Sequence, residues 1–296
     1  MKKMMMAAVM LLVMITMHAT GKGLLWKVTG NNLSKPTYIV GSHHFIPATM
    51  IDSISGLRDA IAAADVVYGE IEAEKLTSPE AMKLMMEMSA APADSTLDKV
   101  LTPEQMSQLD NVLAKYAGMP GLAAQLTPMK PALVSTQITV MQTSKAIPGL
   151  NLMAEQFDTG VMNYGKSLGK PVRGLETLES QMNLLLGASI ASQADDLVKA
   201  VELDDKSCDM IKRLTDAYMA GDIELMLTLM TDAEIGASPE EMERTIYSRN
   251  RDWVAQLKAL MPKESLMVVV GSGHLPGDEG MINLLRKAGY TVEPVK

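Results

Sequence analysis

Two short segments near opposite ends of the chain have almost the same sequence. Residues 38–44 are Tyr-Ile-Val-Gly-Ser-His-His, and residues 268–274 are Val-Val-Val-Gly-Ser-Gly-His. Each is an apolar run that ends in Gly-Ser-x-His, and a proline follows a few residues later, at Pro47 and Pro276. The chain has 4 histidines. One of them, His18, lies near the N-terminus, and the other three all lie in these two segments.

An apolar, β-branched run that ends in glycine is typical of a buried strand leaving a sheet. Ligands of open α/β sheets bind in the crevice beyond the carboxyl ends of the strands. We therefore expect His44 and His274, the members that both segments share, to point from two strand ends into one site. A single histidine at a strand end is more often structural, but two in the same context favour function. His43 has Gly273 at the corresponding place, so its role stays open.

The N-terminal residues have the pattern of a secretory leader. Lys2 and Lys3 precede an apolar stretch, residues 4–17, that is too short for an ordinary membrane span. We predict that residues 1–20 are a signal peptide and that residues 21–296 form a single domain without a stable membrane span. An uncleaved anchor is the alternative. The leader predicts export to the periplasm or the extracellular space.

Charge and cysteine content exclude several classes of function. The formal net charge is −8, and no basic stripe is present that would displace counterions from a phosphate backbone, so we expect no nucleic-acid binding. The sole cysteine, Cys208, cannot form an internal disulfide. A lone thiol of this kind is more often buried than catalytic, and we assign it no chemistry.

The pattern along the chain predicts strands at both ends with helices inserted between them. Thr102 and Ser238 each begin a capping sequence with proline at the first helical position. The predicted strands are residues 24–29, 37–41, 65–71, 170–175, 266–271 and 290–295, and the predicted helical stretches are residues 53–64, 74–169, 177–231, 238–260 and 279–288. The fold class is therefore α/β, with a mixed central sheet, flanking helices and a large helical insertion.

An acidic strand end supplies a carboxylate that could complete a site with the two histidines. Glu70 and Glu72 flank Ile71, so one of them faces each way. Either alone is as consistent with a solvated strand end as with a site. One carboxylate and two neutral imidazoles form the set that holds a divalent cation with positions left open for water. Without a metal, the same set is a histidine–carboxylate general base.

Two further charged residues are candidates for the same site. Glu176 follows the predicted strand 170–175, where it is a metal ligand, a general base or a carboxylate that caps the next helix. Arg249 lies in the long helix before the second histidine segment. A helical charge run is usually a solvated face, but an arginine that faces carboxylates also anchors a substrate oxygen through two hydrogen bonds.

Taken together, these residues resemble the TraB/PrgY/GumN family, whose relatives include the Tiki metalloproteases. The resemblance runs along the whole chain after the leader and is carried by the following segments: Trp26-Lys27-Val28, Gly41-Ser42-His43-His44, Glu70-Ile71-Glu72, Gly174-Leu175-Glu176-Thr177 with Gln181, Arg249-Asn250 and Gly271-Ser272-Gly273-His274. It implies a fold like that of erythromycin-esterase-like and haem-binding ChaN-like proteins. It also implies a metal site at His44, His274 and Glu70, with Glu72 as the alternative to Glu70.

We therefore predict an exported metal-dependent hydrolase, most consistent with a peptidase. In this hypothesis His44, His274 and Glu70 hold a divalent ion (Mn, Co or Zn), Glu176 is a base or outer ligand, and Arg249 steadies a peptide or small-molecule substrate. The alternative is a non-catalytic protein that binds a peptide or haem with the same histidines. The sequence predicts neither the substrate, nor the oligomeric state, nor the role of the helical insertion.

Overall fold

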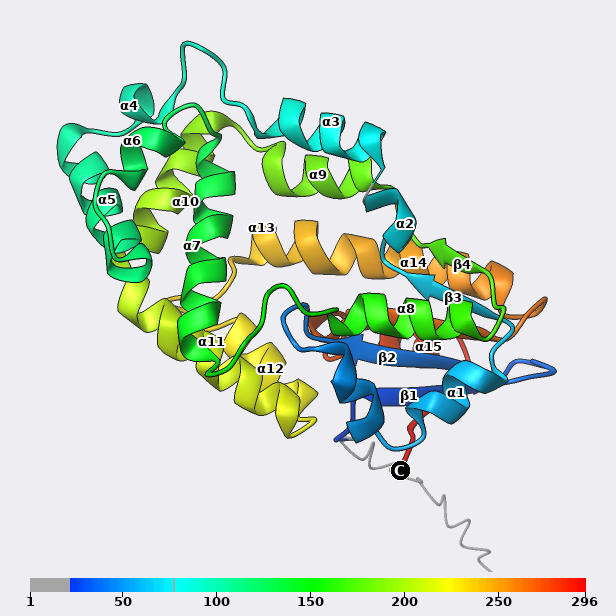
Figure 1. The fold of residues 1–296 in the computed structure, drawn as a ribbon. Helices are drawn as coiled ribbons and strands as arrows, with labels where there is room; N and C mark the ends of the chain where they lie inside the picture. Colours follow the sequence, from blue (N-terminus) through cyan, green and yellow to red (C-terminus); the bar gives the residue numbers. More distant parts are fainter. Residues whose placement is uncertain (1–21, 77) are drawn as a thin grey trace, which may run out of the picture.

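A computed structural model describes residues 22–76 and 78–296 (Figure 1). The predicted leader, residues 1–20, lies outside the described residues. The strands are β1 (Leu25–Gly30), β2 (Thr37–Ser42), β3 (Val66–Gly69), β4 (Val172–Gly174), β5 (Leu266–Gly271) and β6 (Tyr290–Pro294). The α-helices are α1 (Leu57–Ala63), α2 (Ala73–Leu76), α3 (Pro79–Ser89), α4 (Leu97–Val100), α5 (Pro103–Ala117), α6 (Leu122–Leu126), α7 (Pro131–Ala146), α8 (Phe157–Ser167), α9 (Leu178–Leu186), α10 (Ile190–Glu202), α11 (Asp204–Met219), α12 (Ile223–Met230), α13 (Pro239–Met242), α14 (Ser248–Leu260) and α15 (Met281–Lys287).

The strands form one mixed sheet in the order β4-β3-β5-β2-β1-β6. β4, β3, β5 and β2 are parallel to one another, and β1 is antiparallel to both β2 and β6. The predicted α/β class with a mixed sheet is therefore confirmed. The two histidine segments belong to β2 and β5, which are direct neighbours in register, with Ser42 opposite Gly271.

Helices bury both faces of the sheet, as the continuous apolar strands require. Along β5, Val268 and Val270 join one core cluster, which α11, α12, α14 and α15 complete, whereas Met267 and Val269 join the cluster formed with α1 and α8. Figure 1 shows α8 and α14 on either side of the strands. The two histidine-bearing strand ends are therefore fixed by packing on both faces.

The helical insertion builds a core of its own. Helices α4, α5, α6, α7 and α10 enclose a third cluster of buried side chains, which includes Leu97, Leu109 and Ile138. α3 packs on α9 beside this group (Figure 1). None of the helices in the described part of the chain combines the length and the apolar character needed to cross a bilayer.

Local capping explains where the helices begin and where the prediction was wrong. The predicted capping boxes at Thr102 and Ser238 are both present. The helix predicted from residue 53 begins later, because residues Ala48–Ser53 form a 3-10 helix and Gly56, with φ 75°, caps α1. The helix predicted from Ser238 to residue 260 contains a π-helical turn, η2 (Glu243–Tyr247), between α13 and α14. Such turns occur frequently at functional sites.

Candidate functional site

The carboxyl ends of four parallel strands place the predicted side chains at one edge of the sheet. His44 follows β2, Glu70 follows β3, Glu176 follows β4 and His274 follows β5. β3 lies beside β5 and β5 lies beside β2, so the residues that follow these strands are neighbours although they are far apart in the sequence. The structure therefore brings the predicted residues from all four strand ends to the same crevice.

Gly271 lies where the two histidines and the acid meet. A methyl group placed on this glycine would lie 3.4 Å from Glu70 Oε1, 3.5 Å from His44 Nε2 and 3.6 Å from His274 Cδ2. Glu70 Oε1 lies 3.9 Å from His274 Nε2. The three side chains thus surround one small space, which exists because residue 271 has no side chain.

Glu70 is the buried carboxylate of this space. Its side chain is 11% exposed. Its Oε1 accepts a hydrogen bond from the Gly271 backbone N–H at 2.8 Å, and its Oε2 accepts from Arg249 Nη2 at 2.7 Å and from Gln181 Nε2 at 3.1 Å. Burial acts to raise the pKa of Glu70, but the positive charges of Arg249 and His44, together with the hydrogen bond from the Gly271 N–H, hold the pKa below its ordinary value. Glu70 is therefore ionised at neutral pH.

Arg249 joins Glu70 to Glu176 and to His274. Its Nη2 lies 2.6 Å from Glu176 Oε1, its Nε lies 3.2 Å from Glu176 Oε2, and its Nη1 donates to Thr245 O at 2.9 Å. Nη1 also lies 3.1 Å from His274 Nε2. A guanidinium has five N–H donors, and these five contacts give each of them a protein acceptor. Arg249 must exchange one of these acceptors to bind a substrate oxygen.

His274 is buried and neutral. Its Nδ1 lies 2.7 Å from Asn250 Oδ1, and the Asn250 amide nitrogen donates to the backbone oxygens of His274 and Glu279. This orientation makes Asn250 Oδ1 an acceptor, so we assign the proton of the ring to Nδ1 and the lone pair to Nε2, which faces Arg249. Burial lowers the pKa of His274 to about 3.

His44 has the opposite electrostatic environment. Its Nδ1 lies 3.3 Å from Asp158 Oδ2, and the hydroxyl of Ser42 donates to the other oxygen of Asp158. The hydrogen bond to Asp158 raises the pKa of His44 to about 9. The imidazole is 63% exposed, whereas the side chain of Asp158 is 20% exposed. A carboxylate therefore fixes the Nδ1 side of the ring and leaves Nε2 facing the space beside Gly271.

The structure also separates the candidates from their neighbours in sequence. Glu72 pairs with Lys75 at 2.9 Å and makes no contact with the histidines. His43 turns toward α11, where its ring packs edge-on against Tyr218 and its Nε2 lies 3.3 Å from Thr215 Oγ1. Its Nδ1 accepts from the Phe45 backbone N–H, so both ring nitrogens have protein partners, and burial lowers its pKa to about 4. Of the pair Glu70 and Glu72, Glu70 faces the space beside Gly271. Of the pair His43 and His44, His44 faces it.

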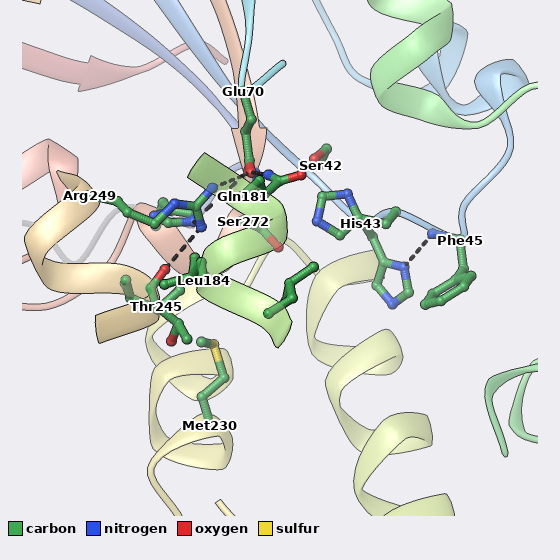
Figure 2. A pocket seen from close by; sticks show the side chains of 16 residues that line it. Ser42, His43, Phe45, Glu70, Gln181, Leu184, Met230, Thr245, Arg249 and Ser272 are labelled. Atoms are coloured by element: carbon green, nitrogen blue, oxygen red, sulfur yellow. Dashed lines mark hydrogen bonds and ion pairs between the residues drawn. The ribbon is translucent and has the colours of Figure 1, made fainter. Parts of the chain in front are cut away.

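A cavity of about 580 Å³ opens in front of these residues. Figure 2 shows Glu70, Gln181 and Arg249 pointing toward one another at one side of it, with Leu184 and Met230 on its wall. This volume lies within the range of small-molecule binding sites. The crevice is therefore large enough to admit a ligand to the histidines and Glu70.

Comparison with known proteins assigns the chain to a family. The family model described as TraB/PrgY/gumN matches residues 24–294. The chain belongs to this family. It is 22% identical over 338 aligned positions to a protein of Nematostella vectensis named "Metalloprotease TIKI homolog", an alignment that covers 92% of this chain and 67% of that protein. No solved structure matches the chain.

Because a TraB/PrgY/gumN relative is named a metalloprotease, we tested whether the site suits a divalent ion. His44 Nε2 and Glu70 Oε1 face a common space, which His274 borders with its Cδ2, and His274 Nε2 lies 3.9 Å from Glu70 Oε1. The Nδ1 of each ring is fixed by an outer partner, Asp158 or Asn250. Metal-binding histidines usually have this second hydrogen bond. The donor set therefore fits a divalent ion. Within residues 22–76 and 78–296, however, no three His, Cys, Asp or Glu side chains are already spaced to hold one.

Two features oppose such an ion: the proton that His44 carries at neutral pH, because its pKa is raised to about 9, and the guanidinium of Arg249. Its Nη1 donates to the lone pair of His274 Nε2, which is the lone pair that a metal would take. The guanidinium must therefore leave this position before His274 can coordinate an ion. The predicted ligand roles of His44, His274 and Glu70, and the predicted roles of Glu176 and Arg249, stay predictions.

Sequence analysis missed Asp158. It lies in the first turn of α8, within the stretch predicted as helical, and an acidic residue in the first turn of a helix is common because it complements the helix dipole. Nothing in the sequence connects it to His44, which is 114 positions away. Asn250 and Gln181 were noted only as parts of the family resemblance, and the structure gives each a specific contact.

Proposed function

We propose that this TraB/PrgY/gumN protein is a metal-dependent hydrolase, with peptides as its favoured substrates. The observation that carries the proposal is the meeting of His44, His274 and Glu70 around Gly271. Two imidazoles and a carboxylate with open positions beside them are typical of hydrolytic metal centres. The name of the Nematostella relative supports the same class of reaction.

In this proposal His44, His274 and Glu70 hold the divalent ion, which is Mn²⁺, Co²⁺ or Zn²⁺. A bound divalent ion lowers the pKa of water and polarises a carbonyl oxygen, which is the chemistry that hydrolysis needs. Asp158 and Asn250 orient the two imidazoles so that both Nε2 atoms face the ion. Glu176, held beside Glu70 by Arg249 and Gln181, is the base or outer ligand.

We further propose that Arg249 steadies a substrate oxygen after it releases His274 Nε2. The released N–H groups of Nη1 then face the reacting carbonyl, where charge develops in the transition state. This movement leaves the bonds from Arg249 Nε and Nη2 to Glu176 intact. The guanidinium thus changes one acceptor while it still neutralises the buried carboxylates.

The site of action is also a proposal. Lys2, Lys3 and the apolar residues 4–17 support export to the periplasm or the extracellular space, with a mature protein that carries no membrane span. The acidic balance, with a net charge of −8, supports a peptide or small-molecule partner rather than nucleic acid. We also propose that the fold is that of erythromycin-esterase-like and ChaN-like proteins, because the resemblance to the TraB/PrgY/GumN family implies this fold.

A metal-free hydrolase is the second candidate, and two contacts favour it. Asp158 fixes the Nδ1 of His44, so that Nε2 faces the space where an attacking water would lie. Because the pKa of His44 is raised to about 9, the ring is a base only after it loses its Nε2 proton, and the rate of this mechanism rises with pH up to about 9. Arg249 already donates to His274 Nε2, which leaves no lone pair there for an ion. In this mechanism His44 is the general base, and a chelator does not change the rate.

The first experiment measures metal uptake and peptide cleavage in the same preparations. The purified protein is titrated with Mn²⁺, Co²⁺ and Zn²⁺, and a peptide library is digested with and without EDTA. We expect one ion per chain, and cleavage that EDTA abolishes. The variants His44→Ala, His274→Ala and Glu70→Gln each lose uptake. Glu72→Gln, which changes a carboxylate paired with the exposed Lys75, keeps it.

The outcomes separate the candidates. Metal uptake that survives in either histidine variant contradicts the metal centre. Cleavage that is insensitive to EDTA but lost in His44→Ala supports the histidine base instead. A Soret band on addition of haem, or peptide binding without any cleavage, supports the non-catalytic binding protein.

A further inference from the structure

A second, smaller cavity adjoins the first and shares lining residues with it. It has a volume of about 230 Å³, against about 580 Å³ for the first cavity. His44, Glu70 and Gln181 line both cavities. The two cavities therefore meet at these three residues, and a ligand whose reacting bond lies over them extends into both.

The larger cavity has an apolar wall. Apart from the site residues, its lining includes Phe45, Leu184 and Leu185 of α9, Met230 of α12 and Ile246 of the π-helical turn η2. Leu185 is 54% exposed, so part of this apolar wall is open to a ligand. This side of the crevice offers apolar contact and few hydrogen bonds.

The position of Met230 ties this apolar wall to the second histidine segment. A methyl group placed on Gly273 would lie 2.7 Å from Met230 Cε and 2.9 Å from its Sδ. Gly273 therefore leaves the room that Met230 occupies, and this explains why the second segment has glycine where the first has His43. The apolar wall begins directly beside His274.

The smaller cavity presents hydrogen-bonding groups beside the apolar side chains of Ile71 and Met162. Asp158, Thr159 and Gln156 contribute to it from the N-terminal end of α8 and the residue before it. The amide nitrogen of Gln156 donates to Ala154 O at 2.6 Å, whereas its Oε1 is buried without a partner. A buried acceptor without a partner is costly. This side favours a small group that donates hydrogen bonds.

We propose that the centre selects peptides with a large apolar side chain on one side of the scissile bond and a small hydrogen-bonding residue on the other. The apolar side chain lies against Leu184, Leu185, Met230 and Ile246, and the small residue enters the cavity beside Thr159. This inference rests on the proposed hydrolase. Apolar contact favours the large side chain through the surface it removes from water, and the small volume beyond Glu70 excludes a second bulky residue.

The test combines cleavage with equilibrium binding. Two sets of blocked hexapeptides carry Gly, Ala, Ser, Glu, Leu or Phe, one set at the position before the cut and the other at the position after it. The wild-type protein digests both sets, and the binding of each peptide is measured by calorimetry. We expect Leu and Phe to exceed Ser and Glu by about tenfold or more in kcat/KM at one position next to the cut. At the position across the cut, Gly, Ala and Ser are expected to exceed Leu and Phe.

Two variants locate the preference in the structure. Met230→Lys places a charge in the apolar wall, and we expect KM for the Leu peptide to rise about tenfold with little change in kcat. Leu225→Lys is the matched control, because Leu225 lies on the same helix, is 44% exposed and does not line the cavity. Thr159→Leu fills the smaller cavity and is expected to reject Ser while it still accepts Gly at that position.

The binding measurement distinguishes failure of this inference from failure of the proposed hydrolase. Cleavage without any preference, or a preference that Met230→Lys and Leu225→Lys leave equally unchanged, overturns the inference and leaves the hydrolase. Preferential binding of Leu and Phe peptides that Met230→Lys removes, with no cleavage by the wild-type protein, supports the inference and contradicts the hydrolase. Melting temperatures of both variants exclude a general loss of fold.

Discussion

The two Gly-Ser-x-His segments have the same sequence pattern and opposite environments. In the first, a carboxylate, Asp158, holds a histidine that is 63% exposed, and the pKa of His44 rises to about 9. In the second, a neutral amide, Asn250, holds a histidine that is 4% exposed, and the pKa of His274 falls to about 3. The strand end determines where an imidazole points. Its outer partner and its burial determine whether it carries a charge.

The largest expected effect of this difference is an asymmetric dependence of stability on pH. The pKa of His274 is lower in the folded protein than the 6.5 of the unfolded chain, so its contribution is present above pH 6.5 and is lost as the pH falls toward 3. This amounts to several kcal/mol. The pKa of His44 is higher when folded, so its contribution is present below pH 6.5 and is lost as the pH rises through 9. Because His44 is exposed, solvent screening limits this loss to about 1 kcal/mol.

Denaturant unfolding between pH 5 and pH 9 measures both sides of this dependence. His43, whose pKa is lowered to about 4, adds to the acid side, so single variants are needed. In His274→Gln, the slope of the unfolding free energy between pH 5 and pH 6 is expected to fall by about 1.4 kcal/mol per pH unit, the value for one proton. In Asp158→Asn, the loss above pH 6.5 is expected to disappear. An unchanged slope in His274→Gln would show that this imidazole is charged in the folded protein.

The next effect is the cost of removing each outer partner. Asn250→Ala leaves the Nδ1 of a buried imidazole and two backbone oxygens without hydrogen bonds, and we expect the unfolding free energy to fall by about 3 kcal/mol. Asp158→Ala is expected to cost about 1 kcal/mol, because water reaches the exposed ring of His44 and replaces the carboxylate. Chemical denaturation at pH 7 measures both. Equal losses would contradict the difference in burial.

The smallest expected effect is a difference in unfolding free energy between alanine substitutions at Gly41 and at Gly271, the glycines of the two segments. A methyl group at Gly41 would lie 2.7 Å from Leu275 Cδ1 and 3.0 Å from the Cα of Ser272, so Gly41→Ala is expected to cost about 1–3 kcal/mol through overpacking. Gly271 has φ −50° and ψ 133°, which alanine also adopts, and its nearest neighbours lie at 3.4 Å or more. Gly271→Ala is expected to change the unfolding free energy by less than about 1 kcal/mol.

Gly41→Ala and Gly271→Ala also test the proposed metal site, because one substitution is expected to reduce stability and the other to reduce metal uptake and cleavage. Gly271→Ala fills the space between His44, His274 and Glu70, so metal uptake and cleavage are expected to fall sharply although the protein stays folded. Gly41→Ala is expected to lower the melting temperature and to leave metal affinity within about twofold below that temperature. Normal metal uptake in Gly271→Ala would place the ion elsewhere.

The sequence was most informative where structure depends on local pattern. The apolar run before Gly271 predicted β5 to the residue, and the capping boxes at Thr102 and Ser238 predicted two helix starts. The repetition of Gly-Ser-x-His was enough to expect that two strand ends meet, because parallel strands place their carboxyl ends at one edge. Local pattern also failed at α1, where a 3-10 helix delays the start to Gly56.

What the sequence could not supply is the set of contacts made across the fold. The partner of His44 is Asp158, and the five donors of Arg249 are used by four residues from four different segments of the chain. Neither set of contacts can be read from the spacing of the residues in the sequence, since long helical segments separate the partners. The choice of Glu70 over Glu72 likewise depends on where β3 ends and on which side of the strand the Gly271 N–H lies.

The parallel pairing of β2 with β5 determines when a working centre can first exist. Thr37 and Leu266, which are joined by a hydrogen bond at the start of this pairing, are 229 positions apart. During synthesis the segment with His44 therefore leaves the ribosome long before the segment with His274. A nascent chain that stops within the intervening helices carries half of the centre and has nothing with which to complete it. If the proposed hydrolase is correct, the chain stays inert until almost the last of its strands has been added.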